Sequence, residues 1–116
     1  FNPPNWIFAP VWTTLYIMMG IAAHLVSKEL KKNEEAAKGL AVFSVQLILN
    51  AVWSVVFFGA KDLFLALIVI AILWFLIALT IMQFGKVSRD AALLLYPYIV
   101  WVSFASVLNA AVWLMN

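Results

Sequence analysis

The sequence predicts an all-α membrane protein that forms a single transmembrane domain over residues 1–116. Hydrophobic residues make up 67% of the chain and charged residues 10%, whereas a soluble domain is about half apolar and about a quarter charged. The mean hydropathy is +1.08. Polar side chains are too few to cover a soluble globule of this length, so membrane lipid is the expected solvent and partner of the chain.

Four apolar stretches are separated by charged breaks, and each reaches the roughly 20 residues that a helix needs to cross a hydrocarbon core of about 30 Å. The predicted transmembrane helices lie at residues 6–27, 40–60, 63–85 and 91–115. Strands are not expected, because the runs are continuously apolar and do not alternate. The short break Lys61-Asp62 predicts that the second and third helices are antiparallel neighbours. Pro97 removes a backbone hydrogen bond and predicts a local kink.

The basic residues indicate the orientation of the helices in the membrane. Six of the seven Lys and Arg residues lie in loops 28–38 and 86–90. Short basic loops stay in the cytoplasm, so these two loops are predicted to be cytoplasmic and both chain ends to lie on the other side. The net charge of +2 therefore indicates membrane topology and no nucleic-acid partner. Acidic and basic residues alternate at helical spacing in the first loop, which predicts a solvated helical extension.

Several kinds of chemistry are not expected from this composition. There is no cysteine, which excludes disulfides, thiolate metal sites and cysteine nucleophiles. The carboxylates lie in predicted loops, so no buried acid pair is available for proton relay or hydrolysis. The single histidine, His24, has two interpretations: an axial ligand to a metallated macrocycle, or a side chain that reaches headgroups and water from the helix end.

Aromatic, polar and mostly small residues recur on one face of three predicted helices, at spacings of three, four and seven residues. These residues are Trp12, Tyr16, Gly20 and Ala23 on the first helix, Gln46, Asn50, Trp53, Ser54 and Phe57 on the second, and Tyr98, Trp101, Ala105, Leu108 and Asn109 on the fourth. Three such faces fit an apolar pocket for a flat hydrophobic ligand. They fit close helix packing through small residues equally well.

The depth of each polar or aromatic residue suggests its role. Trp6 and Trp113 lie at helix ends, where tryptophan anchors a helix to the membrane interface. Trp12, Trp53 and Trp101 lie deeper and are better pocket candidates.

Asn50 lies near the middle of the second predicted helix, where an unpaired amide is costly. It must therefore hydrogen-bond a neighbouring helix or a ligand.

These residues, in their order and spacing, resemble the translocator protein family, also called TspO or peripheral benzodiazepine receptor. The resemblance runs essentially from end to end. The matching segments are 4–12 (PNWIFAPVW) with Leu15, Tyr16, Met19 and Gly20; 46–50 (QLILN) with Trp53, Ser54 and 57–59 (FFG); Val87, Ser88, Ala91 and Ala92; and 95–98 (LYPY) with Trp101, Phe104, Ala105, Leu108, Asn109 and Trp113.

The resemblance implies a bundle of five transmembrane helices, of which the four predicted here are the second to the fifth. The missing first helix would precede Phe1, and the start Phe1-Asn2-Pro3-Pro4 has none of the features of a signal peptide. The resemblance also implies a pocket that opens towards the loop before the first predicted helix. Members of the family bind porphyrins, drug-like aromatic amides and, in animals, cholesterol.

The resemblance assigns the ligand-binding residues and indicates which residues would take part in any photochemistry. The implied site comprises Trp12, Tyr16, Asn50, Trp53, Trp101, Ala105 and Leu108, and Tyr98 beside the Pro97 kink is added from the helical pattern. The match favours a ligand-facing role for Asn50. Trp12 and Trp101 correspond to tryptophans implicated in light-dependent porphyrin breakdown, which would proceed by indole oxidation.

One departure from the family pattern concerns the source of the protein and its ligand. The animal cholesterol motif requires a tyrosine followed by a basic residue near the end of the last helix, but segment 107–114 reads VLNAAVWL and has neither. The resemblance therefore implies a microbial member in a cytoplasmic membrane, without sterol binding by that route.

Three functions follow as hypotheses. The first is a tetrapyrrole-binding receptor, chaperone or transporter, with a porphyrin as ligand and no covalent cofactor. The alternative is an accessory subunit that packs in a larger, pigment-bearing complex; a homodimer or larger membrane complex is a further expected partner. The third is a porphyrin-degrading enzyme, which the sequence does not favour because it supplies no acid–base or metal apparatus.

Overall fold

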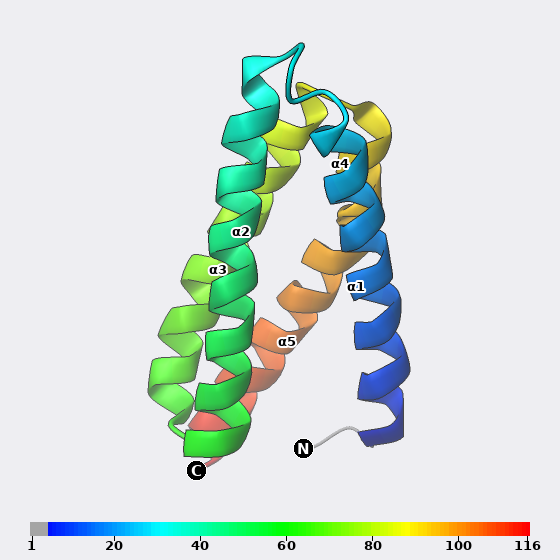
Figure 1. The fold of residues 1–116 in the computed structure, drawn as a ribbon. Coiled ribbons are helices and arrows are strands. Elements are labelled where there is room, and N and C mark those ends of the chain that lie inside the picture. The colour runs from blue at the N-terminus through cyan, green and yellow to red at the C-terminus, as the bar shows by residue number, and fades with distance from the viewer. Residues whose placement is uncertain (1–4) are drawn as a thin grey trace.

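The apolar stretches form helices that run along a common bundle axis (Figure 1). The computed structural model describes the backbone of residues 5–116 and the side chains of residues 9–116. Its helices are α1 (Asn5–Ser27), α2 (Glu34–Ser54), the π-helix η1 (Val55–Ala60), α3 (Leu63–Gly85), α4 (Arg89–Leu94) and α5 (Tyr96–Met115). The predicted all-α membrane bundle is confirmed, and no strand occurs among these described residues.

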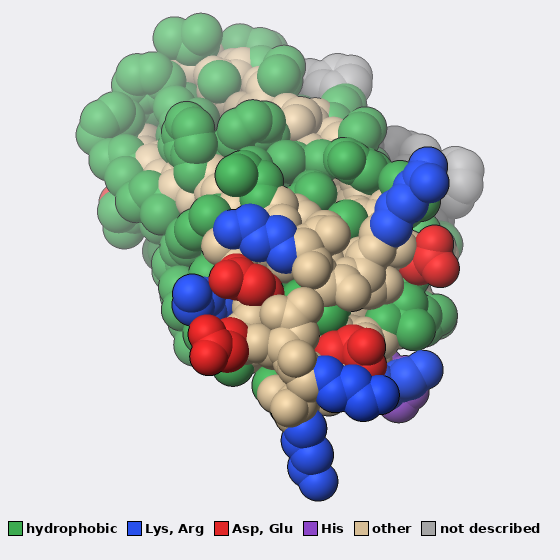
Figure 2. Space-filling model, turned by 90° about the horizontal axis from the view of Figure 1, so that it is seen from above, with side chains coloured by type: hydrophobic (Ala, Val, Ile, Leu, Met, Phe, Trp, Pro, Cys, Tyr) green, Lys and Arg blue, Asp and Glu red, His purple; other side chains and the backbone are tan. Residues whose placement is uncertain are grey.

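Four helical segments are long and apolar enough to cross a membrane. They are Ala9–Ser27, Glu34–Ala60, Leu63–Gly85 and Arg89–Met115. The bundle is 50 Å long, which exceeds a hydrocarbon core of about 30 Å. Its ends can therefore project into water. Figure 2 shows charged side chains gathered at the end of the bundle that carries loops 28–33 and 86–88.

The second helix begins at Glu34, six residues before the predicted start at residue 40. Asn33 caps it, because the side-chain Oδ1 accepts a hydrogen bond from the Glu35 backbone N–H at 2.9 Å. Glu34 and Glu35 then place negative charge in the first turn, where the helix dipole favours it. The start is thus set by polar capping and not by hydropathy. Of loop 28–38, residues 34–38 are helical, whereas residues 28–32, which include Glu29, form turns.

The second helix ends in a π-helical turn that the sequence analysis did not anticipate. In η1 the chain continues with wider turns to Ala60, and Lys61 then terminates it in the left-handed region at φ 56°. Asp62 caps α3 by accepting a hydrogen bond from the Leu65 N–H at 3.1 Å. This tight connection makes α2 and α3 antiparallel neighbours, and α3 occupies its predicted range (Figure 1).

The predicted fourth helix, 91–115, is two helices separated at Leu95. Pro97 lies in the first turn of α5, where its missing N–H costs no hydrogen bond. The expected local kink is therefore a break between α4 and α5. The helical segment also begins earlier than predicted, at Arg89, because the Ser88 hydroxyl caps the Ala91 N–H at 3.2 Å.

Helix packing is uneven around the bundle. The pair α2 and α3 packs most extensively, and α5 lies against α3. Gly39 of α2 permits the close approach of α2 to α3, since a Cβ at this position would lie only 2.9 Å from Cδ1 of Phe84 in α3. In contrast, α1 packs mainly on α4 and less on α2, and it stands apart from α2 and α5 over much of its length (Figure 1).

Candidate functional site: an aromatic cluster and a buried polar chain

Three aromatic side chains from α1 and α5 form what we call the aromatic cluster: Trp12, Tyr16 and Trp101. Trp12 and Tyr16 are one helical turn apart on α1 and stack with ring centroids 5.7 Å apart and planes at 28°. The Trp101 ring meets Trp12 edge to face, with centroids 6.2 Å apart and planes at 90°. Both geometries are favourable for aromatic pairs. The structure thus brings together three of the predicted site residues from segments distant in sequence.

A chain of hydrogen bonds leads from this cluster into the bundle, and we call its members Tyr16, Asn50, Tyr98 and Gln46 the polar chain. The Tyr16 hydroxyl donates to Asn50 Oδ1 at 2.8 Å. Asn50 Nδ2 donates to the Tyr98 Oη at 2.8 Å, and the Tyr98 hydroxyl donates to Gln46 Oε1 at 2.6 Å. These bonds link α1, α2 and α5 through side chains alone.

Burial explains why these groups are paired. Asn50, Tyr98 and Gln46 are each 1% exposed, and a buried polar group without a partner is costly in a membrane interior. Gln46 and Asn50 are four residues apart on α2 and so present both amides to Tyr98. Both polar groups of the Asn50 amide are engaged here. A direct ligand contact by Asn50 would use the second N–H or the second lone pair of this buried amide.

Trp53 lies in a second polar contact, nearer to η1. Its indole Nε1–H donates to Asn109 Oδ1 at 3.0 Å, and Asn109 Nδ2 donates to the Leu63 carbonyl at 2.9 Å. The Trp53 ring stacks on Phe57 with centroids 4.9 Å apart. These contacts join α2, α3 and α5, so the structure places Trp53 in helix packing.

The remaining predicted site residues lie on the inner face of α5. Ala105 and Leu108 are buried in the protein. Ala105 is one helical turn from Trp101 on the same helix. Gln46 and Asn109 were not selected as site residues from the sequence, although both lie on the polar faces. The feature that could have identified them is a strongly polar amide, at helical spacing from other site residues, inside an apolar transmembrane helix.

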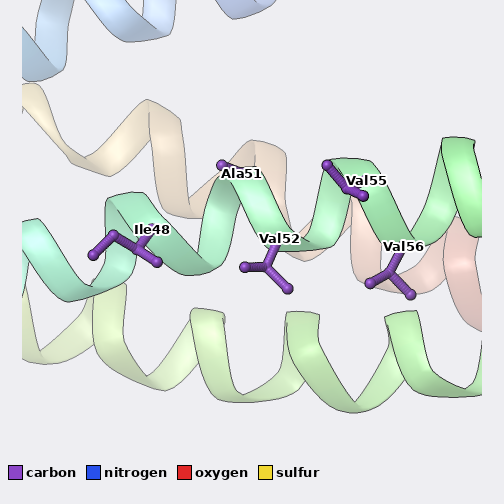
Figure 3. A pocket seen from close by; sticks show the side chains of 5 residues that line it. All are labelled: Ile48, Ala51, Val52, Val55 and Val56. Atoms are coloured by element: carbon purple, nitrogen blue, oxygen red, sulfur yellow. The ribbon is translucent and has the colours of Figure 1, made fainter.

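Apolar grooves occur on the outer surface of the bundle. A groove of about 350 Å³ is lined by Ile48, Ala51, Val52, Val55 and Val56 (Figure 3). All five side chains are aliphatic and come from α2 and η1, so the groove suits hydrocarbon chains. A smaller groove, of about 240 Å³, lies on α1 beside Pro10, Val11, Thr14 and Leu15. Neither groove contains a predicted site residue.

The residues considered for metal ligation or for anchoring at the membrane interface lie at the ends of the helices. His24 is exposed in the last turn of α1, a position that suits contact with headgroups or water. Within the described side chains, no cluster of three or more His, Cys, Asp and Glu residues could hold a metal ion. Trp113 is exposed near the end of α5 and packs on Phe64 at 5.3 Å. The side chain of Trp6 and residues 1–4 lie outside the described part of the structure.

The fold and the site together define a multi-pass helical membrane protein with tryptophan and tyrosine side chains between its helices. The sequence matches the TspO/MBR family over residues 1–114. It is 48% identical to "Tryptophan-rich protein TspO" of Chlorobaculum tepidum, over 99% of this chain and 73% of the relative. It is 40% identical to "Protein CrtK" of Rhodobacter capsulatus (98% and 71%) and 41% identical to "Translocator protein" of Ovis aries (99% and 69%). The chain belongs to the TspO/MBR family, which confirms the resemblance.

Proposed function

We propose that this protein binds a tetrapyrrole, a porphyrin or a related flat macrocycle, and acts as a membrane receptor, chaperone or transporter for it. The observation that carries the proposal is the aromatic cluster, in which Trp12 and Tyr16 of α1 meet Trp101 of α5 beside a chain of buried polar groups. Related proteins named "Translocator protein" and "Tryptophan-rich sensory protein" support a role in transport or sensing.

The chemistry of the cluster suits a flat, conjugated ligand. Indole and phenol rings stack on an aromatic partner and contribute about 0.5–1.5 kcal/mol per pair beyond the buried area. Behind the rings, Asn50 and Tyr98 hold the Tyr16 hydroxyl in place through the polar chain, and Ala105 and Leu108 supply apolar surface. Trp53 would act indirectly, by fixing the position of α2 next to Asn50.

Binding, and not turnover, is the proposed activity. The groups that surround the cluster are phenols, amides and indoles, none of which serves readily as an acid–base pair at neutral pH. In light, an excited porphyrin bound at the cluster would have Trp12 and Trp101 as its nearest oxidisable indoles.

Tryptophan fluorescence quenching by protoporphyrin tests the proposal in detergent. Trp12→Phe and Trp101→Phe each remove an indole stacking surface, so each dissociation constant should rise about 2- to 12-fold, the equivalent of about 0.5–1.5 kcal/mol. Trp74→Phe is the matched control, because the Trp74 indole donates to Ser103 Oγ at 2.8 Å and takes no part in the cluster. Dissociation constants that remain unchanged in both cluster variants would exclude this site.

A further inference from the structure

All hydrogen bonds of the polar chain donate in the same direction, from Tyr16 towards Gln46. The shortest bond sets this direction. The Tyr98 Oη and Gln46 Oε1 are 2.6 Å apart, a distance typical of O–H···O and shorter than N–H···O bonds usually are. Gln46 therefore presents its amide oxygen, and Tyr98 must supply the proton.

The direction then passes along the chain to Tyr16. Tyr98 has one proton and gives it to Gln46, so it accepts from Asn50 Nδ2 at 2.8 Å. Asn50 consequently turns its oxygen to Tyr16, and this oxygen can only accept. The hydroxyl proton of Tyr16 is thus used in the bond to Asn50. The Tyr16 oxygen can therefore accept a further hydrogen bond but has no proton left to donate.

The opposite direction would not pair the buried groups better. Gln46 Nε2 has no hydrogen-bond partner among the described side chains. If every bond of the chain pointed the other way, Gln46 Nε2 would donate to Tyr98 and the Gln46 oxygen would be unpaired instead. The bond between Gln46 and Tyr98 would then be an N–H···O bond of only 2.6 Å. The observed direction is therefore the better one.

The Tyr16 oxygen is also the part of the chain that a ligand can reach. Tyr16 is 45% exposed, whereas the other three members are each 1% exposed. Its ring belongs to the aromatic cluster through Trp12. In a chain of aligned hydrogen bonds, a hydroxyl that donates one bond becomes a stronger acceptor for another. The Tyr16 oxygen should therefore attract a hydrogen-bond donor of the ligand.

We propose that the aromatic cluster selects flat ligands that donate a hydrogen bond from their outer edge, through an N–H or O–H on the periphery of the ring, over ligands that present an acceptor there. This inference rests on the proposed function, because it assumes that the aromatic cluster is the ligand site. It adds the polarity of the ligand edge, which stacking alone does not specify.

Three rigid tricycles of similar size test this selectivity by isothermal titration calorimetry in one detergent. Carbazole carries a ring N–H donor, fluorenone carries a carbonyl acceptor, and fluorene carries neither. In the unchanged protein, carbazole should bind about 2- to 10-fold more tightly than fluorene, the effect of one net hydrogen bond, and fluorenone should gain nothing over fluorene.

Tyr16→Phe should abolish the carbazole preference, so that carbazole and fluorene bind the variant equally, and the binding that remains shows that the variant is folded. Comparison between the two proteins cancels the different partitioning of the tricycles into detergent. Tyr96→Phe is the control for the same chemical change, because Tyr96 is an exposed residue at the start of α5, outside the polar chain; it should keep the preference.

Each contrary result identifies which idea fails. Equal binding of all three tricycles to the unchanged protein would overturn the donor selectivity and leave aromatic binding intact. Tighter binding of fluorenone would mean that Tyr16 donates to the ligand, which overturns the proposed direction of the chain. If none of the three bound, the cluster would not be an aromatic site, and the proposed function itself would fail.

Discussion

Asn50 joins three helices with one side chain. Its oxygen accepts from Tyr16 of α1, its nitrogen donates to Tyr98 of α5, and its own backbone belongs to α2. Hydrogen bonds between membrane helices contribute about 0.6 kcal/mol each on average. Asn50 has a larger effect on the position of α1. This helix packs mainly on α4, and the bond from Tyr16 to Asn50 holds it beside the interior of the bundle.

Asn50→Ala should destabilise the empty protein by about 1 kcal/mol, because two interhelical bonds are lost and Tyr98 loses its donor. Thermal unfolding in detergent, with and without protoporphyrin, measures this loss. The same decrease is expected in both states if the amide bridges helices. The exposed Asn116→Ala is the control and should change nothing.

A different pattern would support the ligand-facing role that the family resemblance suggests for Asn50. In that case, the empty variant would be as stable as the unchanged protein, and only the stabilisation by added protoporphyrin would decrease.

The ends of the helices are set by single polar or conformationally special residues. Asn33 and Ser88 cap α2 and α4 before their apolar residues begin. Pro97 separates α4 from α5, so that α4 packs on α1 and α3 while α5 follows α3. At the end of η1, Lys61 adopts a left-handed backbone conformation with φ 56°. A residue with a Cβ adopts this conformation at a cost of about 1–2 kcal/mol.

Lys61→Gly should therefore stabilise the protein, by up to about 1 kcal/mol, because glycine enters the left-handed region without steric cost although it is freer when unfolded. Lys61→Ala is the matched control. It removes the charge but keeps the Cβ, and should give no gain. Unfolding by denaturant in mixed micelles would compare the three proteins. An equal gain from both substitutions would attribute the effect to the lysine charge and not to the backbone.

At the scale of the whole molecule, charge separates the two ends of the bundle. Most of the charged residues lie in or beside loops 28–33 and 86–88, and Figure 2 shows their side chains gathered at that end of the bundle. There Glu35 pairs with Lys38 at 3.5 Å and with Lys86 at 3.8 Å, which ties the start of α2 to the end of α3. Exposed pairs of this kind contribute little stability. The excess of basic residues in these loops instead predicts that this end faces the cytoplasm.

Cysteine labelling tests that orientation, since the chain has no cysteine of its own. Leu30→Cys and Asn116→Cys place thiols at exposed positions at opposite ends of the bundle. A membrane-impermeant maleimide should label position 116 in intact cells and position 30 only after permeabilisation. Permeabilised cells control for reactivity at both sites. Labelling of position 30 in intact cells to the same extent as position 116 would contradict the predicted topology.

Much of the architecture follows from local features of the sequence. Hydropathy identified four spans, and it located α3 well because Asp62 and Lys86 border an uninterrupted apolar run. It placed the starts of α2 and of the α4 segment too late, because capped first turns are polar. The π-helical turn η1 left no hydropathy signal. A local kink at Pro97 was predicted from the missing N–H, but the separation into two helices was not.

The sequence by itself determined that this protein is a helical membrane protein, which residues share a helix face, and which polar groups need partners. Helix hydrogen bonds join residues four apart, so one-dimensional spacing contains this information. Only the tertiary structure decided the partners. The bonds from Tyr16 to Asn50, Asn50 to Tyr98 and Tyr98 to Gln46 span 34, 48 and 52 residues. Such distant donors and acceptors meet because of how helices cross, which depends on the packing of all side chains together.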